Sequence, residues 1–177
     1  AGLSVLVTAG GTREPLGPVR YIGNRSTGKQ GHALATEAAS RGAKVHCVTT
    51  QPDTAPDIIG VEITPVETAE EMARAVADRA PDADIVLMAA AVADFRPAAV
   101  AAQKIKKADG IPEVRLVPTT DILAELGQQR NENQVLVGFA AETTDLNQNA
   151  TAKLTAKKVD LIVANDVSAP SAGFGHD

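Results

Sequence analysis

The chain is poor in aromatic residues and in cysteine. Of its 177 residues one is tyrosine, three are phenylalanine and none is tryptophan, so its core has to be built from Ala, Val, Leu and Ile. The single cysteine, Cys47, excludes an internal disulfide framework and suits a reducing compartment. A chain of this length is long enough for one full α/β sheet, and we therefore predict one domain over residues 1–177.

An excess of positive charge and a long hydrophobic run are also missing. The formal net charge is −5, and no basic tract is interleaved with aromatics, so we expect no nucleic-acid partner. No apolar run is long enough to cross a bilayer, and no signal peptide or lipidation motif is present, so we expect a cytoplasmic protein without a membrane partner. Lysines nevertheless cluster in two places, where they can attract a small polyanion: residues 104–107 and 153–158.

Apolar runs alternate with helical patterns along the chain. The most apolar runs are continuous, as is typical of strands buried on both faces of a sheet. Right-handed crossovers between them predict a Rossmann-like, doubly wound, mainly parallel sheet flanked by helices. The expected strands are Leu3–Val7, Lys44–Thr49, Val61–Pro65, Ile85–Ala89, Val114–Val117, Val135–Phe139 and Leu161–Ala164.

Four helices are expected between these strands. One follows Gly28 and ends at Gly42, and another ends near Pro81 after a capping box formed by Thr68 and Glu71. The other two are Asp121–Arg130, with Thr119 or Thr120 as its cap, and Leu146–Lys158. We expect residues 96–113 to form a mobile flap, because they are rich in Ala and Lys and show no periodicity.

The stretch from Leu3 to Arg41 reads as a buried strand, a long glycine-rich loop and the start of a helix. Glycine lets backbone N–H groups approach an anion, and a helix N-terminus offers unpaired donors, so this order predicts phosphate binding. The alternative is an ordinary loop between a strand and a helix. The candidate phosphate-binding residues are Gly10, Gly11, Thr12, Ser26 and Gly28.

Two familiar nucleotide motifs do not fit this loop. GNRSTGKQ, at residues 23–30, nearly matches a P-loop, but Gln30 replaces the hydroxyl that binds magnesium, and the segment does not directly follow its strand. Gly10 and Gly11 do not open a G-x-G-x-x-G fingerprint either. We therefore reject both a P-loop NTPase and a standard NAD-binding site.

Further candidate site residues come directly after other predicted strands. Open α/β sheets bind ligands at the carboxyl ends of their strands. Asp94, in AAAVADFRP, suits a metal ion or a ribose hydroxyl, although it would also cap a helix. Asp121 suits magnesium, although a carboxylate in a first helical turn is favourable without a ligand. Phe139 is placed to stack on a base. Lys153 and Lys157 share one helix face and suit a triphosphate, or they simply face water.

These segments together predict a nucleoside triphosphate site without a protein nucleophile. No Ser–His–Asp order, Cys–His pair or zinc-ligand spacing occurs, and the three histidines are scattered. Carboxylates and lysines around a triphosphate suit nucleotidyl activation of a substrate acid, catalysed by positioning and by charge stabilisation.

Six motifs occur in an order that closely resembles phosphopantothenoylcysteine synthetase. They are TAGGTREPLGPVRYIGNRSTGKQG, AAAVADFRP, KIKK, TTDIL, GFAAET and LIVANDVS. The nearest resemblance is to the bacterial CTP-dependent form, usually the C-terminal half of a bifunctional coenzyme A biosynthesis protein. The resemblance implies a domain cut from such a chain, without its C-terminal end. FMN is then expected only on the other half, a flavin-dependent decarboxylase, which is absent here.

The resemblance implies a ligase that uses CTP in two steps. CTP and 4′-phosphopantothenate give an acyl-cytidylate and pyrophosphate, and L-cysteine then gives 4′-phosphopantothenoylcysteine and CMP. Asn24 and Lys104 are the implied catalytic residues, and magnesium or a similar cation, with Asp94 and Asp121 as candidate ligands, would accompany CTP. The implied CTP-binding residues are Met88, Ala89, Ala90, Asp94, Lys104, Thr120, Asp121, Ile122, Leu123, Phe139, Lys153 and Lys157.

The family also forms dimers whose phosphopantothenate pocket is completed across the interface, and the flavoprotein half builds larger assemblies. This sequence has Gly11 where many members carry Pro, and Thr119-Thr120 where many carry Asn-Pro. Neither change removes a charged group. The alternative function is a non-catalytic nucleotide- or dinucleotide-binding module, but an NAD site would place a carboxylate at the end of the strand Lys44–Thr49, and none occurs before Asp53.

Overall fold

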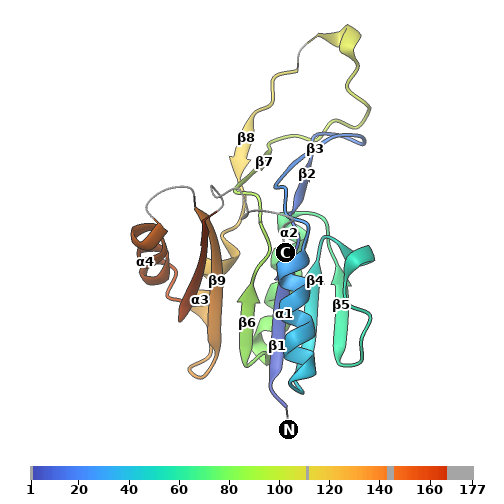
Figure 1. Cartoon of the computed structure of the whole chain (residues 1–177). Helices are drawn as coiled ribbons and strands as arrows, with labels where there is room; N and C mark the ends of the chain where they lie inside the picture. The colour runs from blue at the N-terminus through green and yellow to red at the C-terminus, as the bar shows by residue number, and fades with distance from the viewer. Residues whose placement is uncertain (1, 111, 143–145, 167–177) are drawn as a thin grey trace.

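The computed structural model describes residues 2–110, 112–142 and 146–166. Its centre is a six-stranded sheet in which every neighbouring pair is parallel, as predicted (Figure 1). The order across the sheet is β10-β9-β6-β1-β4-β5. The strands are β1 (Ser4–Ala9), β4 (Lys44–Thr49), β5 (Val61–Pro65), β6 (Ile85–Met88), β9 (Val135–Glu142) and β10 (Leu161–Asp166).

This order is the one found in doubly wound dinucleotide-binding folds. The chain first runs outward from β1 through β4 to β5, then returns to β6 on the other side of β1 and continues to β9 and β10. The direction of winding therefore reverses between β1 and β6. In open α/β sheets, ligands bind at this reversal, outside the carboxyl ends of the strands.

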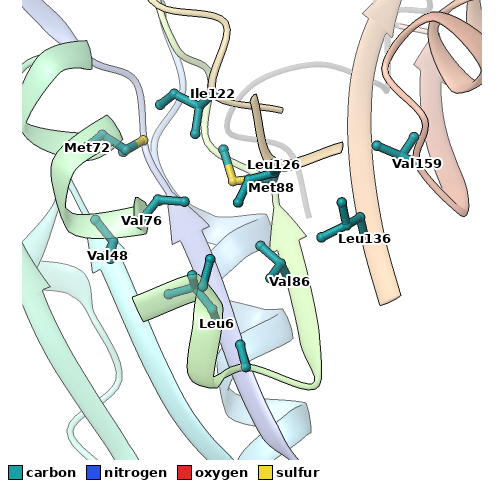
Figure 2. Packing of buried hydrophobic residues seen from close by; sticks show 12 residues of the cluster. Leu6, Val48, Met72, Val76, Val86, Met88, Ile122, Leu126, Leu136 and Val159 are labelled. Atoms are coloured by element: carbon teal, nitrogen blue, oxygen red, sulfur yellow. The ribbon is translucent and has the colours of Figure 1, made fainter. Parts of the chain in front are cut away.

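Helices cover both faces of the sheet. Helix α1 (Lys29–Ser40) packs on the face that carries Val5, Val7 and Cys47. Helices α2 (Ala69–Arg79) and α3 (Ile122–Gln129) pack on the opposite face around Leu6 and Leu136, as Figure 2 shows, and Leu154 of α4 (Leu146–Ala156) joins that cluster. None of the described helices combines the length and the apolar character needed to cross a bilayer.

The helix caps match the sequence at α2 and differ at α3. At α2, the Thr68 hydroxyl accepts a hydrogen bond from the Glu71 N–H, and the Glu71 carboxylate accepts one from the Thr68 N–H, so the predicted capping box is confirmed. At α3, the prediction of Thr119 or Thr120 as the cap is wrong. Asp121 caps the helix, because its carboxylate accepts a hydrogen bond from the Ala124 N–H. The Thr119 hydroxyl instead donates a hydrogen bond to the Ala93 carbonyl.

Two short antiparallel pairs rise from the carboxyl edge of the sheet (Figure 1). They are β2 (Arg13–Pro15) with β3 (Tyr21–Gly23), and β7 (Phe95–Pro97) with β8 (Leu116–Pro118). We call residues 13–23 and 95–118 the arm. β2, β3 and β7 were expected to be loop, and the strand expected at Val114–Val117 is shifted to β8, which pairs with β7. Asp94 therefore precedes a strand and caps no helix.

Short 3-10 turns complete the described structure. They are η1 (Pro52–Thr54) after β4, η2 (Ala80–Asp82) after α2 and η3 (Lys107–Asp109) in the arm. The turn η3 lies inside the segment that the sequence predicted as a flap.

Candidate functional site

The loops that follow β1 and β6 are joined by hydrogen bonds at the reversal point of the sheet. The Ala91 N–H donates to the Gly10 carbonyl at 2.8 Å, and the Thr12 N–H donates to the Ala91 carbonyl at 3.2 Å. The buried Thr12 hydroxyl accepts from the Ala93 N–H at 2.9 Å, and the Thr8 hydroxyl accepts from the Ala90 N–H at 3.1 Å. Two segments about 80 residues apart in sequence thus form one fixed rim.

Asn24 lies against this rim. Its side-chain amide donates to the Ala91 and Val92 carbonyls, at 3.3 and 3.4 Å. The Asn24 carbonyl also comes so close to Gly11 that a Cβ on Gly11 would lie 2.6 Å from it. A side chain at position 11 would therefore displace Asn24, and the glycine in this sequence permits the close approach.

The N-terminus of α1 meets the same rim. Gly28 is the N-cap of α1, with φ 81°, a left-handed conformation that glycine adopts without strain. Its N–H donates to the Ser26 hydroxyl at 3.4 Å, and a Cβ on Gly28 would lie 3.4 Å from the Gly10 nitrogen. No side chain caps α1, so the helix brings its N-terminal backbone donors to the predicted phosphate loop.

A second set of predicted residues continues along the edge towards α3. The Thr119 N–H donates to the Asp94 carbonyl at 3.0 Å, which joins the start of α3 to the loop after β6. Asp121, two residues further on, forms an ion pair with Lys157 at 3.2 Å. Asp121 is exposed, so this pair adds little stability, but it brings together two residues that the sequence assigned to one ligand.

Several predicted nucleotide contacts also belong to the core. The side chains of Met88 and Ile122 are only 6% and 5% exposed, so a ligand would reach mainly their backbone. Met88 pairs with Gly138 across β6 and β9, and Leu123 occupies the space above Gly138, where a Cβ would lie 2.6 Å from a Leu123 methyl group. Phe139 is the next residue and points to the opposite face of the sheet, where it is half-buried.

Lys104 lies apart from the rim, in the arm. The Arg20 guanidinium donates to the Ile105 carbonyl at 3.1 Å, and the Ala101 N–H donates to the Leu16 carbonyl at 3.0 Å. These contacts hold the segment that carries Lys104 against the β2–β3 pair, with Lys104 itself exposed. Thr120 is also exposed, and Lys153 is half-buried on α4, one turn before Lys157.

The structure also identifies supporting residues whose role the sequence did not indicate. Thr8, Thr119 and Arg20 hold the loops that carry the candidate residues. The sequence suggested Thr119 only as a helix cap and gave Thr8 no role, because each hydroxyl finds its partner through tertiary contacts with the loop after β6. Arg20 belongs to the recognised RYIGN run but was not assigned a role.

The described histidines and the cysteine do not resemble catalytic groups. His32 is buried, contacts the Thr49 hydroxyl at 2.9 Å, and burial lowers its pKa. Burial also raises the pKa of Cys47 to about 11, so its thiol is protonated at neutral pH. Both observations agree with a site that has no protein nucleophile.

Comparison with known proteins identifies the family. Residues 1–177 match the family described as DNA/pantothenate metabolism flavoprotein C-terminal domain. The coenzyme A biosynthesis bifunctional protein CoaBC of Mycobacterium tuberculosis is 50% identical over 177 residues, covering 94% of this chain and 42% of that protein. The Bacillus subtilis CoaBC is 49% identical over 177 residues, covering 99% of this chain and 43% of that protein.

A solved structure agrees with these relatives. The crystal structure of the C-terminal domain of a CoaBC protein is 40% identical, with a TM-score of 0.79, and the match covers 94% of this chain and 78% of that one. The chain spans less than half the length of the curated relatives named above. It belongs to the DNA/pantothenate metabolism flavoprotein C-terminal domain family, the family of the C-terminal domain of the coenzyme A biosynthesis bifunctional proteins.

Proposed function

We propose that this domain is a CTP-dependent phosphopantothenate–cysteine ligase in coenzyme A biosynthesis. One observation carries the proposal beyond family membership. The loop after β1, the loop after β6 and Asn24 are hydrogen-bonded into one rim at the reversal point of the sheet, beside the N-terminus of α1. A rim of this kind suits a nucleotide whose phosphates face the helix and whose base lies along the strand ends.

The reaction needs no protein nucleophile. A carboxylate oxygen of 4′-phosphopantothenate attacks the α-phosphorus of CTP, the bond to the bridging oxygen breaks, and pyrophosphate leaves. The amine of L-cysteine then attacks the acyl carbon of the mixed anhydride, loses a proton, and displaces CMP. The enzyme's contribution is to align the reactants and to offset the negative charge of the phosphates.

The candidate residues divide between these tasks. Lys104 would supply positive charge when pyrophosphate forms, after its segment moves from the arm towards the rim. Asn24 would orient the acyl-cytidylate for attack by cysteine, since its amide already lies against the loop after β6. CTP would contact the remaining set: Met88, Ala89, Ala90, Asp94, Thr120, Asp121, Ile122, Leu123, Phe139, Lys153 and Lys157.

Magnesium would arrive with CTP rather than occupy a site of its own. Within residues 2–110, 112–142 and 146–166, no three His, Cys, Asp or Glu side chains gather where they could hold a metal ion. Mg²⁺ commonly binds substrate phosphates plus one or two carboxylates, which Asp94 and Asp121 can supply. The Asp121 carboxylate already accepts from Ala124 and pairs with Lys157, so Asp94 is the more accessible of the two.

The arm suits a homodimer contact. Its surface carries exposed apolar side chains, of which Val19, Tyr21 and Phe95 are more than half exposed. Exposed apolar side chains are common at interfaces, so we propose that two copies pair through the arm and that the flavoprotein half builds any larger assembly. Light scattering of the purified domain tests this proposal, and a monomer at micromolar concentration would contradict it.

Pyrophosphate release tests the function directly. The domain is incubated with CTP, 4′-phosphopantothenate and L-cysteine, and each is omitted in turn. We expect release without cysteine, and CMP formation at the full rate only when cysteine is added. No release with all three would contradict the ligase. Thermal stabilisation by NAD in preference to CTP would instead favour the non-catalytic binding module.

A further inference from the structure

Glu14 is a buried carboxylate to which the proposed chemistry gives no task. Its side chain is 1% exposed, although it lies in the short strand β2 at the base of the arm. One carboxylate oxygen accepts a hydrogen bond from the Ala69 N–H at 2.9 Å. Ala69 is the first residue of α2, so the negative charge lies at the positive end of that helix.

A backbone contact strengthens this junction. The Arg13 N–H donates to the Glu67 carbonyl at 2.9 Å, two residues before α2 begins. Residues 13 and 14 are therefore held to the start of α2 and the residues just before it by two hydrogen bonds. This attachment lies directly beside Thr12, whose hydroxyl holds the Ala93 N–H in the loop after β6.

The same junction also fixes the strand β3, which ends one residue before Asn24. Glu14 pairs with Ile22, and Arg13 pairs with Gly23, in the β2–β3 ladder. A Cβ on Gly23 would lie only 2.6 Å from the Thr12 carbonyl, so these segments are in close contact. Moving Glu14 would shift Thr12 on one side and Asn24 on the other.

We propose that Glu14 is a positioning residue for the CTP site. By binding the N-terminus of α2, its carboxylate fixes the position of the loop after β1 relative to the loop after β6. In that position the Thr12 hydroxyl accepts from the Ala93 N–H, and the Asn24 side chain reaches the Ala91 carbonyl. The predicted effect on catalysis rests on the function proposed above, whereas the predicted effect on amide exchange in the loop after β6 does not depend on that function.

Thr68 supplies a matched control at the same helix end. Its hydroxyl accepts from the Glu71 N–H, so Thr68→Ala removes a cap from α2 but does not cut the link to β2. A purely structural Glu14 would behave as Thr68 does. A positioning Glu14 would change the site, whereas Thr68→Ala would change only stability.

Three Glu14 variants and Thr68→Ala are compared by amide hydrogen exchange at Ala93 and by kcat/KM for CTP. Glu14→Ala leaves the Ala69 N–H without its partner, so we expect faster exchange at Ala93 and about a tenfold loss in kcat/KM. Glu14→Asp is shorter and should lose about threefold, whereas the amide oxygen of Glu14→Gln can still accept and should restore most of the activity.

The outcomes separate the two roles. Thr68→Ala should lower the melting temperature yet leave Ala93 exchange and kcat/KM near those of the original chain. If Thr68→Ala altered both site measurements as Glu14→Ala does, the positioning role would be wrong. If Glu14→Ala fails to fold, Glu14→Asp is used to test the positioning role. A Glu14→Asp protein whose Ala93 exchange and kcat/KM equal those of Thr68→Ala would overturn the proposal. If the original chain releases no pyrophosphate, the function fails, and Ala93 exchange alone still tests Glu14.

Discussion

Compared with the arm, the centre of the six-stranded sheet buries its apolar side chains almost completely. Leu6 and Leu136 in the sheet are 1% and 0% exposed, whereas Tyr21 and Phe95 in the arm are each 55% exposed. The sheet is held by two packed faces and five parallel strand pairings, while the arm consists of two three-residue strand pairs. The sheet therefore supplies most of the stability, and the arm supplies an exposed surface.

This difference assigns different tasks to the two regions. A side chain in the sheet can fix a loop because its own position is fixed, as Thr8 does for Ala90. The segment between β7 and β8 is attached to the β2–β3 pair through a few hydrogen bonds, such as that from Arg20 to Ile105. Loosely held segments are the ones that can close over a ligand.

The largest effect on stability should come from the sheet. Leu6→Ala removes a fully buried side chain between α2 and β6, so we expect it to lower the free energy of unfolding by about 2–5 kcal/mol. Leu116→Ala makes the same chemical change in β8 of the arm, at a residue that is 45% exposed, and should cost about 1 kcal/mol or less. Urea unfolding measures both. Equal losses would mean that the two-region comparison is wrong.

A change in the arm should affect catalysis and leave stability intact. Lys104→Gln removes the proposed counter-charge for the departing pyrophosphate, so we expect a loss of about 10²–10³-fold in the rate of pyrophosphate release. Lys106→Gln, an exposed neighbour, is the control and should retain most activity. Neither variant should shift the melting temperature. Normal release by a folded Lys104→Gln protein would remove the arm from the mechanism.

A smaller effect is expected where the arm meets the rim. Asn24→Asp would replace an N–H donor by a carboxylate facing the Ala91 and Val92 carbonyls and an anionic intermediate. We expect acyl-cytidylate to form and its consumption by cysteine to slow about tenfold, as single-turnover kinetics would measure. Asn131→Asp makes the same change between α3 and β9 and should have no kinetic effect. Unaltered consumption by Asn24→Asp would make Asn24 a simple loop residue.

The smallest effect concerns pH and two histidines, His32 of α1 and His46 of β4. The pKa values of His32 and His46 are lowered from 6.5, in both cases chiefly by burial, and for His46 also by the Arg79 charge, against the opposing Glu62 carboxylate. Below pH 6.5 the unfolded chain therefore binds more protons than the folded one, so stability is full above that pH and declines as pH falls below it.

Thermal melts across this range measure the decline. His46→Gln should flatten part of the curve, because it removes one of the two groups. A melting temperature independent of pH between about 7 and 5 would contradict the assignment.

Strand positions in the sheet were predictable because each rests on a local pattern. The expected limits of Lys44–Thr49 and Val61–Pro65 match β4 and β5, and the box formed by Thr68 and Glu71 is present. The hairpin strands were not predictable. β2, β3 and β7 each have three residues, too few for a periodic signal, and form only because another short strand lies beside them.

The candidate site divides in the same way. Residue type and motif order led to Asn24, Asp121 and Lys157, and the structure adds that Asp121 pairs with Lys157 and that Asn24 contacts the loop after β6. The cap of α3 was misassigned because Thr119 and Asp121 are both good capping residues. Only the tertiary contact between Thr119 and Ala93 decides between them.

The sequence by itself determined the strands and helices of the central layer and the family, because these depend on residue type and on spacing along the chain. The tertiary structure alone decided the strand order across the sheet, the burial of Glu14 at α2 and the joining of the loops after β1 and β6. The last two features depend on hydrogen bonds between residues 55 to 82 positions apart, which no local pattern encodes.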